Sequence, residues 1–422
     1  MASLDQAAGR QSATTGHDSK IIGLISAGHF FSHFYLLTLP PLFLFLQKDF
    51  GVSYVELGLA MTAYNLIGGV IQAPVGFLVD RIGARLLLLL GFGLNALAVG
   101  LIGVAGSYWM LLALAVLAGI GNSVFHPADY AIMSGTVSEA KVGRAFGIHT
   151  FSGFFGGSVA PITIGLLAAM WGWRAALIVA GALGLVTLAV MAANSGILGQ
   201  VAPGAKSEHR AVNDGAGARR GWSLLLTPAM LLFFALFCAI TFTTSGLYAF
   251  TINGLIDLHG TPYTLANAAL TGFLMASSFG VLLGGFLADR VGRHDLVASI
   301  ALIFAAATIV LPAYLALSPI ALVFVLSLSG LAFGTVQPAR DMMVRAITPA
   351  SEMGKAFGFL SVGMSVGSSI SPLIFGWFMD THRPDFVFLA AAGFMLVTLL
   401  AALSGRFVGV RSGMARPRAV VR

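Results

Sequence analysis

Twelve long apolar runs limit the folds open to this chain more than any other feature of its sequence. A helix of about 20 apolar residues crosses the ~30 Å hydrocarbon core of a bilayer and satisfies its own backbone hydrogen bonds there. Only 9% of the 422 residues are charged, and the mean hydropathy is +0.92. The sequence therefore predicts an all-α integral membrane protein with twelve transmembrane helices, at residues 21–46, 54–78, 86–106, 109–131, 144–168, 173–195, 228–256, 263–288, 294–316, 319–340, 355–379 and 385–405.

The first apolar run, residues 21–46, is expected to stay in the membrane as a span. It is longer than the ~7–15 residues of a signal-peptide core, and no small-residue cleavage site follows it. The polar residues 1–20 before it are expected to form a disordered tail.

The distribution of basic residues predicts the orientation of the chain. If both termini lie on one side, that side receives all of the 23 lysines and arginines except Lys48, Arg174 and Arg383. Cytoplasmic loops carry such an excess, so both termini are expected in the cytoplasm. The net charge of +7 then indicates topology and contact with anionic lipid, and not a nucleic-acid site.

The second half of the sequence repeats the first. GFLVDRIGAR at residues 76–85 recurs as GFLADRVGRH at 285–294, an offset of 209 residues (285 − 76). GRAFG at 143–147 recurs as GKAFG at 354–358, an offset of 211 (354 − 143). A duplicated six-span unit explains both matches. The expected organisation is a cytoplasmic tail at 1–20, six-helix bundles at 21–196 and 225–405, a linker rich in Gly, Ala and charge at 197–224, and a basic tail at 406–422.

Two six-span halves, each with an Asp-Arg loop after its second span, resemble the major facilitator superfamily. The resemblance runs from about residue 21 to residue 406. It implies two pseudo-symmetric six-helix bundles around a central cavity that opens alternately to each side of the membrane. It implies a transporter and not an enzyme, and no cofactor is expected. No Gly-Lys-Ser/Thr phosphate loop occurs, which argues against ATP hydrolysis.

The Asp-Arg loops are expected to act in gating. Gly76 and Gly285 would let helices approach closely, and a carboxylate at Asp80 can cap a helix N-terminus. In the family, this aspartate latches against the start of the eleventh span, near residues 354–355 here. The alternative is that the arginines only anchor topology. Ala84 departs from the family pattern, which usually has a basic residue there. The gating residues implied by the resemblance are Gly76, Asp80, Arg81, Gly83, Arg85, Asp289 and Arg290.

The fifth and eleventh spans share a glycine and proline pattern that resembles the family's antiporter signature. It would form a proline-kinked helix with a smooth face for packing against the opposite bundle. An antiporter signature suggests export, but its presence in both halves also fits symmetric packing. The residues concerned are Gly156, Pro161, Gly165, Gly367 and Pro372.

His29 and His33 lie four residues apart in the first span, so both imidazoles fall on one helix face. A zinc-peptidase motif needs a glutamate after the first histidine, and that position is Phe30. The other seven histidines are scattered singly, and the single cysteine, Cys238, excludes a cysteine-based cage. The sequence therefore predicts no metal site.

An ionisable residue deep in a span is costly and by default faces a cavity. His33 lies roughly 18 Å into the ~30 Å core, near its centre, and histidine exchanges protons near neutral pH. His33, more than His29, is expected to be functional, and the alternative is a buried structural histidine. The expected proton and substrate cavity contains His33, His126, Asp129, His29, His149 and Arg340.

FSH at residues 31–33, together with NSVFHPADY and the following residues to 161, resembles the fosmidomycin-resistance branch of the superfamily. That branch implies proton-driven export of small, often anionic, antimicrobial compounds. Ala115 departs from many drug/proton antiporters, which have an arginine there, so their coupling site does not carry over. Arg340 aligns with Asp129 by the 211-residue offset (340 − 129). The two residues would form a gate pair, or Arg340 would bind an anionic substrate.

The leading prediction is thus proton-coupled efflux of a small organic compound by alternating access, and the alternative is proton-coupled uptake of a small carboxylate. The expected partners are a small-molecule substrate, protons and membrane lipids, and the protein is expected to act as a monomer.

Overall fold

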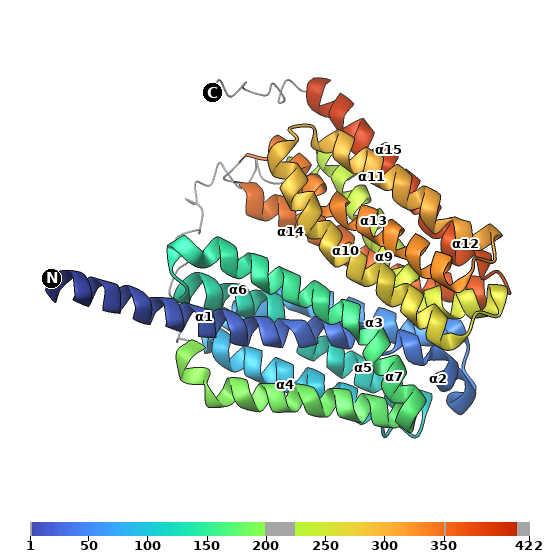
Figure 1. The fold of residues 1–422 in the computed structure, drawn as a ribbon, viewed down its shortest axis with the longest axis horizontal. Helices are drawn as coiled ribbons and strands as arrows, with labels where there is room; N and C mark the ends of the chain where they lie inside the picture. The colour runs from blue at the N-terminus through green and yellow to red at the C-terminus, as the bar shows by residue number, and fades with distance from the viewer. Residues whose placement is uncertain (1, 199–223, 350–351, 412–422) are drawn as a thin grey trace. The chain divides into compact units, whose positions relative to one another are not determined.

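A computed structural model describes residues 2–198, 224–349 and 352–411 of the chain. Every regular element in these ranges is helical (Figure 1). The elements are α1 (Ala2–Leu36), η1 (Pro40–Leu42), α2 (Phe43–Phe50), α3 (Tyr54–Ile82), α4 (Ala84–Ile102), α5 (Tyr108–Asn122), α6 (Phe125–Thr136), α7 (Glu139–Ala193), η2 (Ser195–Leu198), α9 (Pro228–His259), α10 (Tyr263–Arg290), α11 (His294–Ile309), α12 (Leu311–Tyr314), α13 (Pro319–Ile347), α14 (Met353–Asp380) and α15 (Asp385–Arg411). Most of the expected linker, 197–224, lies outside the described residues.

The predicted all-α membrane fold is confirmed. Eleven helices in the described part of the chain are long and apolar enough to cross a membrane. One of them, α7, has 55 residues, or about 80 Å at 1.5 Å per residue, and so is long enough for two crossings. Gly172 breaks α7 with φ 83° and ψ 158°, a conformation that favours glycine. The break lies between the predicted fifth and sixth spans, so these helices account for twelve spans.

Two predicted segments differ from the structure. Residues 2–20 continue α1, so the expectation of disorder there is wrong. They contain no proline, and extending an existing helix needs no new nucleation. The fourth span is two helices, α5 and α6, separated at Ser123 and Val124. Pro127, in the first turn of α6, lacks the backbone N–H that a continuous helix would need there.

The contacts divide the chain into two compact units. Unit 1 contains residues 1–50 and 63–205, and unit 2 contains residues 51–62 and 206–422. The division differs from the predicted boundary at one place, because the first turns of α3 belong to unit 2. Helix α3 is therefore shared, with its remaining turns in unit 1.

The same pairs of helices pack together in each unit. In unit 1, α1 packs on α7, α4 on α5, and α4 on α7. In unit 2, the equivalent spans pair in the same way: α9 packs on α14, α11 on α13, and α11 on α15. The repeated sequence therefore folds into a repeated arrangement of helices.

Glycines at repeated positions bring these helices into backbone contact. A methyl group at Gly156 in α7 would collide with the carbonyl oxygen of Phe30 in α1. Its repeat, Gly367 in α14, meets the carbonyl oxygen of Cys238 in α9 in the same way. The two glycines are 211 residues apart, the offset seen in the sequence. Without a hydrophobic force between helices in lipid, such close contacts stabilise the packing.

Gly156→Ala is expected to destabilise unit 1 by about 1–3 kcal/mol, because the added methyl group meets a backbone oxygen that cannot rotate away. The matched control is Gly147→Ala on the same helix, where an added methyl group meets no atom within 4 Å. Thermal unfolding in detergent should show a lower midpoint for Gly156→Ala only. Equal midpoints for the two variants would contradict the close contact.

Candidate functional site

Five ionisable side chains from three helices of unit 1 form one cluster. His29 and His33 come from the same face of α1, His126 and Asp129 from the first turns of α6, and His149 from α7. Because α1 packs on both α6 and α7, these side chains meet although they are up to 120 residues apart (149 − 29). The structure thus brings together five of the six residues expected in the cavity.

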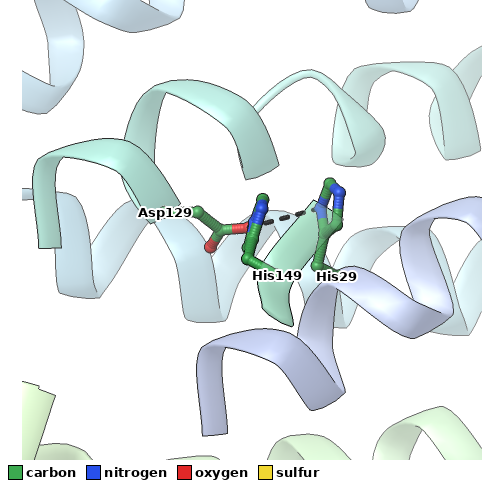
Figure 2. A group of neighbouring side chains, drawn as sticks. All are labelled: His29, Asp129 and His149. Atoms are coloured by element: carbon green, nitrogen blue, oxygen red, sulfur yellow. Dashed lines mark hydrogen bonds and ion pairs between the residues drawn. The ribbon is translucent and has the colours of Figure 1, made fainter. Parts of the chain in front are cut away.

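The carboxylate of Asp129 lies beside the rings of His149 and His29 (Figure 2). Its Oδ2 lies 2.9 Å from Nε2 of His149, which is a hydrogen bond, and 3.5 Å from Nδ1 of His29. The rings of His29 and His149 stack with centroids 3.7 Å apart and planes 20° apart. One carboxylate oxygen therefore faces two imidazoles.

The cluster has a buried part and an accessible part. Asp129, His149 and His29 expose 0%, 1% and 2% of their surface, whereas His33 and His126 are partly exposed. The ring of His29 lies 4.8 Å from that of His33 and 5.1 Å from that of His126. His29 therefore contacts Asp129 and also lies next to both partly exposed histidines.

Four buried polar atoms of the cluster have no hydrogen-bond partner among the described residues. They are Nδ1 of His29, Nδ1 of His126, Nδ1 of His149 and Oδ1 of Asp129. Unsatisfied polar atoms are rare in protein interiors, and each needs a reason. These four atoms therefore leave hydrogen-bonding capacity of the cluster unused.

Three residues of the cluster are close enough together to be considered as ligands of a metal ion. One ligand atom from each of His29, Asp129 and His149 lies within 4.8 Å of the others. A metal ion binds in the plane of an imidazole ring at about 2.0–2.1 Å. The two stacked rings have nearly parallel planes, so one ion cannot lie in both, and Oδ2 of Asp129 is already bonded to His149. A metal ion would require one ring to rotate away.

Two members of this environment carry no signal in the sequence. A methyl group at Gly153 in α7 would lie 2.7 Å from His29 and 2.9 Å from His33, so glycine leaves the room that the imidazoles fill. The ring of Tyr130 lies 5.7 Å from those of His126 and His149. Only the packing of α6 and α7 on α1 identifies these neighbours.

Arg340, the sixth expected residue, lies in α13 of unit 2 and is 7% exposed. Its Nε donates to Asp341 over 2.9 Å, and its guanidinium lies 4.0 Å above the ring of Phe237. Asp129 and Arg340 therefore each have a partner within their own unit. Their pairing as a gate stays a prediction.

The gating residues lie at the ends of helices. Asp80 and Arg81 are exposed in the last turn of α3, and Asp289 and Arg290 are exposed in the last turn of α10. Gly83 has φ 93° and forms the turn before α4, which explains the need for glycine there. Nη1 of Arg85 donates to the carbonyl oxygen of Ser195 over 3.3 Å.

Within its own unit, neither Gly76 nor Gly285 lies at a close helix approach, and their role in gating stays a prediction. A methyl group at either position would meet no atom of its own unit within 4 Å. Both glycines lie near the end of their helix, on a side that no other helix of the unit covers at that level. The close contacts form instead deeper in each unit, at Gly156 and Gly367.

The two prolines of the fifth-span pattern lie inside helices, Pro161 in α7 and Pro372 in α14. Gly165 is buried one turn after Pro161. The kink and packing residues thus occupy equivalent helices of the two units, as the duplication requires.

Comparison with known proteins identifies the family. The sequence profile of the Major Facilitator Superfamily matches residues 25–255 and 239–413. The fosmidomycin resistance protein of Escherichia coli strain K12 is 26% identical over 302 residues, 69% of this chain and 70% of that protein. A probable sulfoacetate transporter of Cupriavidus necator is 25% identical over 402 residues, 91% of this chain and 92% of that protein.

A solved structure shares the fold. The bacterial homologue of the human lysosomal transporter Spinster, in an inward-facing and occupied conformation, matches with a TM-score of 0.76 at 15% identity. The match covers 95% of this chain and 99% of that one. Helices, repeat and sequence profile agree, and the chain belongs to the Major Facilitator Superfamily of secondary membrane transporters.

Proposed function

We propose that this transporter is proton-coupled and exports a small organic compound, with the cluster of His29, His33, His126, Asp129 and His149 as its proton site. The observation that carries the proposal is the fully buried carboxylate of Asp129 beside two stacked imidazoles, with two further histidines in partly exposed positions.

The reason is the cost of charge inside a membrane protein. A buried carboxylate with neutral histidines carries one net negative charge, and one added proton removes it. An unpaired buried charge is expensive, so the protonated and deprotonated clusters favour different surroundings. A conformational change that alters the burial of the cluster would therefore be coupled to proton binding. The titratable groups facing Asp129 are His29 and His33 of α1, His126 and Tyr130 of α6, and His149 of α7.

Export is favoured over uptake by resemblance. The relative from E. coli is named for resistance to fosmidomycin, and removal of an antimicrobial compound from the cell is the direct route to resistance. The second candidate function, uptake of a small organic anion, is favoured by the probable sulfoacetate transporter and by the buried guanidinium of Arg340. The proposal also places both termini in the cytoplasm, which the excess of basic residues on the side of the termini supports. It further includes an inner-membrane location and action as a monomer.

The direction can be tested in inside-out membrane vesicles that contain the protein, with labelled fosmidomycin as one probe and labelled sulfoacetate as the other. An exporter should accumulate fosmidomycin when the vesicle interior is acidic, and collapse of the pH gradient should release it. Accumulation of sulfoacetate in right-side-out vesicles only, with no movement of fosmidomycin, would favour the uptake function instead.

The loop aspartate gives a separate prediction. Asp80→Asn is expected to slow transport while leaving substrate affinity within about twofold, because a gating residue changes the rate of conformational exchange and not the binding site. Transport rate and equilibrium binding of the same probe are the two measurements. A matched control is Asp385→Asn, which removes a carboxylate paired with Arg383 at the start of α15. Weakened binding with unchanged turnover in Asp80→Asn would contradict a gating role.

A further inference from the structure

The beginning of α3 is capped by a residue from the far end of the chain. Asp380, the last residue of α14, accepts a hydrogen bond on Oδ1 from the backbone N–H of Tyr54 over 2.8 Å. Its Oδ2 accepts a second from the N–H of Val55 over 2.9 Å. The first N–H groups of a helix have no partner within the helix and attract negative charge. Both oxygens of this carboxylate are thus used on one helix N-terminus.

Local residues already cap the same helix. The N–H of Ser53 donates to Oε2 of Glu56 over 2.8 Å, and the N–H of Glu56 donates to Oγ of Ser53 over 3.2 Å. This reciprocal pair is the capping box that stabilises many helix starts. Since α3 has a cap of its own, the cap from Asp380 adds a connection between α3 and α14.

The contact continues along the first turns of α3 through a hydrogen bond and close backbone approaches. Oγ1 of Thr62 donates to the carbonyl oxygen of Ser369 over 2.6 Å. A methyl group at Gly376 would lie 2.7 Å from the carbonyl oxygen of Tyr54, and Gly58 meets the backbone of Pro372 equally closely. Small residues and hydrogen bonds make the closest backbone approaches here, while the side chains of Leu57 and Met61 on the same turns are buried.

These contacts explain why residues 51–62 belong to unit 2 while the rest of α3 belongs to unit 1. The hydroxyl of Tyr54 adds a further bond, donating to Oδ2 of Asp257 in α9 over 3.1 Å. A helix shared between two units must move relative to one of them when the units move.

We propose that Asp380 is a gating residue: its carboxylate holds the first turns of α3 in unit 2, and transport requires this cap to open and re-form. Helix α14 carries Asp380 in its last turn, and this carboxylate caps the start of α3. Helix α3 carries Asp80 in its last turn, and the family resemblance predicts that Asp80 latches at the start of α14. On this proposal, the cap from Asp380 and the latch expected of Asp80 are used in alternate states. The proposal rests on alternating access and is independent of the proton site.

The test measures how often residues 51–62 leave unit 2. Met61 is 4% exposed, so a cysteine at this position is shielded while the cap is closed. In a chain carrying Cys238→Ser and Met61→Cys, reaction with a membrane-impermeant maleimide reports opening. The measurement uses proteoliposomes with neither substrate nor pH gradient, so failure of proton coupling does not affect it.

Asp380→Asn should raise the labelling rate at least about tenfold, the change expected when a charged hydrogen-bond pair is lost. The oxygen of the asparagine amide can still accept one of the two hydrogen bonds. The NH₂ group that replaces the second oxygen is a donor, so it faces a backbone N–H and cannot accept from it. The matched control, Glu56→Gln, weakens the local cap of the same helix and should change labelling less than about twofold. Asp80→Asn, which weakens the opposite cap, should lower labelling, and the double variant Asp80→Asn/Asp380→Asn should return toward the parent rate.

Equal acceleration by Asp380→Asn and Glu56→Gln would mean that the helix start only frays, and this result overturns the proposal. Unchanged labelling in a folded Asp380→Asn protein overturns it as well. Where Asp380→Asn does not fold, the same comparison uses Asp380→Glu, and unchanged labelling of that folded variant overturns the proposal.

Discussion

Asp129→Asn is expected to abolish accumulation driven by a pH gradient while substrate exchange without a gradient continues. Asparagine has the size of aspartate and can accept the hydrogen bond from His149, but it cannot take up a proton. A gradient of one pH unit supports about tenfold accumulation per coupled proton. The variant should therefore fall from about tenfold accumulation to none at that gradient.

The measurement compares net accumulation and counterflow exchange in the same proteoliposomes. The control is Asp385→Asn, which removes a carboxylate paired with Arg383 at the start of α15, away from the cluster. A substrate-free check is the number of protons that the purified proteins bind between pH 5 and pH 8. Full pH-driven accumulation by Asp129→Asn would exclude this carboxylate as the proton site.

His29→Gln is expected to abolish pH-driven accumulation, whereas His33→Gln should slow it by at most about a hundredfold. The reason is the position of each histidine. His29 contacts Asp129, whereas His33 lies one helical turn away, and both His33 and His126 are partly exposed. Loss of one entry point leaves the other. His17→Gln, an exposed histidine on the same helix, is the control and should behave like the parent protein.

This expectation reverses the order suggested by the sequence, in which depth in the membrane favours His33. Initial rates and steady-state accumulation of both variants decide between the two. A strong defect in His33→Gln with normal behaviour of His29→Gln would restore the order expected from depth and would place the proton site at the exposed edge of the cluster.

Much of the fold follows from the order of residues alone, because the bilayer restricts the choice. Only helices satisfy their own backbone groups in lipid, so apolar runs of the required length mark the spans directly. The 209- and 211-residue offsets predict the duplication, and the structure repeats it down to the contacts of Gly156 and Gly367. The break at Gly172 also lies at the predicted boundary between two spans.

Sequence reasoning placed five ionisable residues on three spans, but it could not rank them. Depth along a helix is a one-dimensional property, and it favours His33. Contact with Asp129 depends on how α1, α6 and α7 turn toward one another, and that rotation favours His29. This rotation depends on two features: α6 is a separate helix, and Gly153 in α7 has no side chain that would collide with the imidazoles of α1.

The sequence by itself determined the membrane class, the number of spans, the repeat and the family, because each of these depends on hydropathy or on matching residues along the chain. Tertiary structure alone decided which side chains meet. Asp380 lies 326 residues from Tyr54 and matches no motif, yet its carboxylate caps α3. The physical reason is that a hydrogen bond depends on a few ångströms of distance, and such distances arise only when distant helices pack.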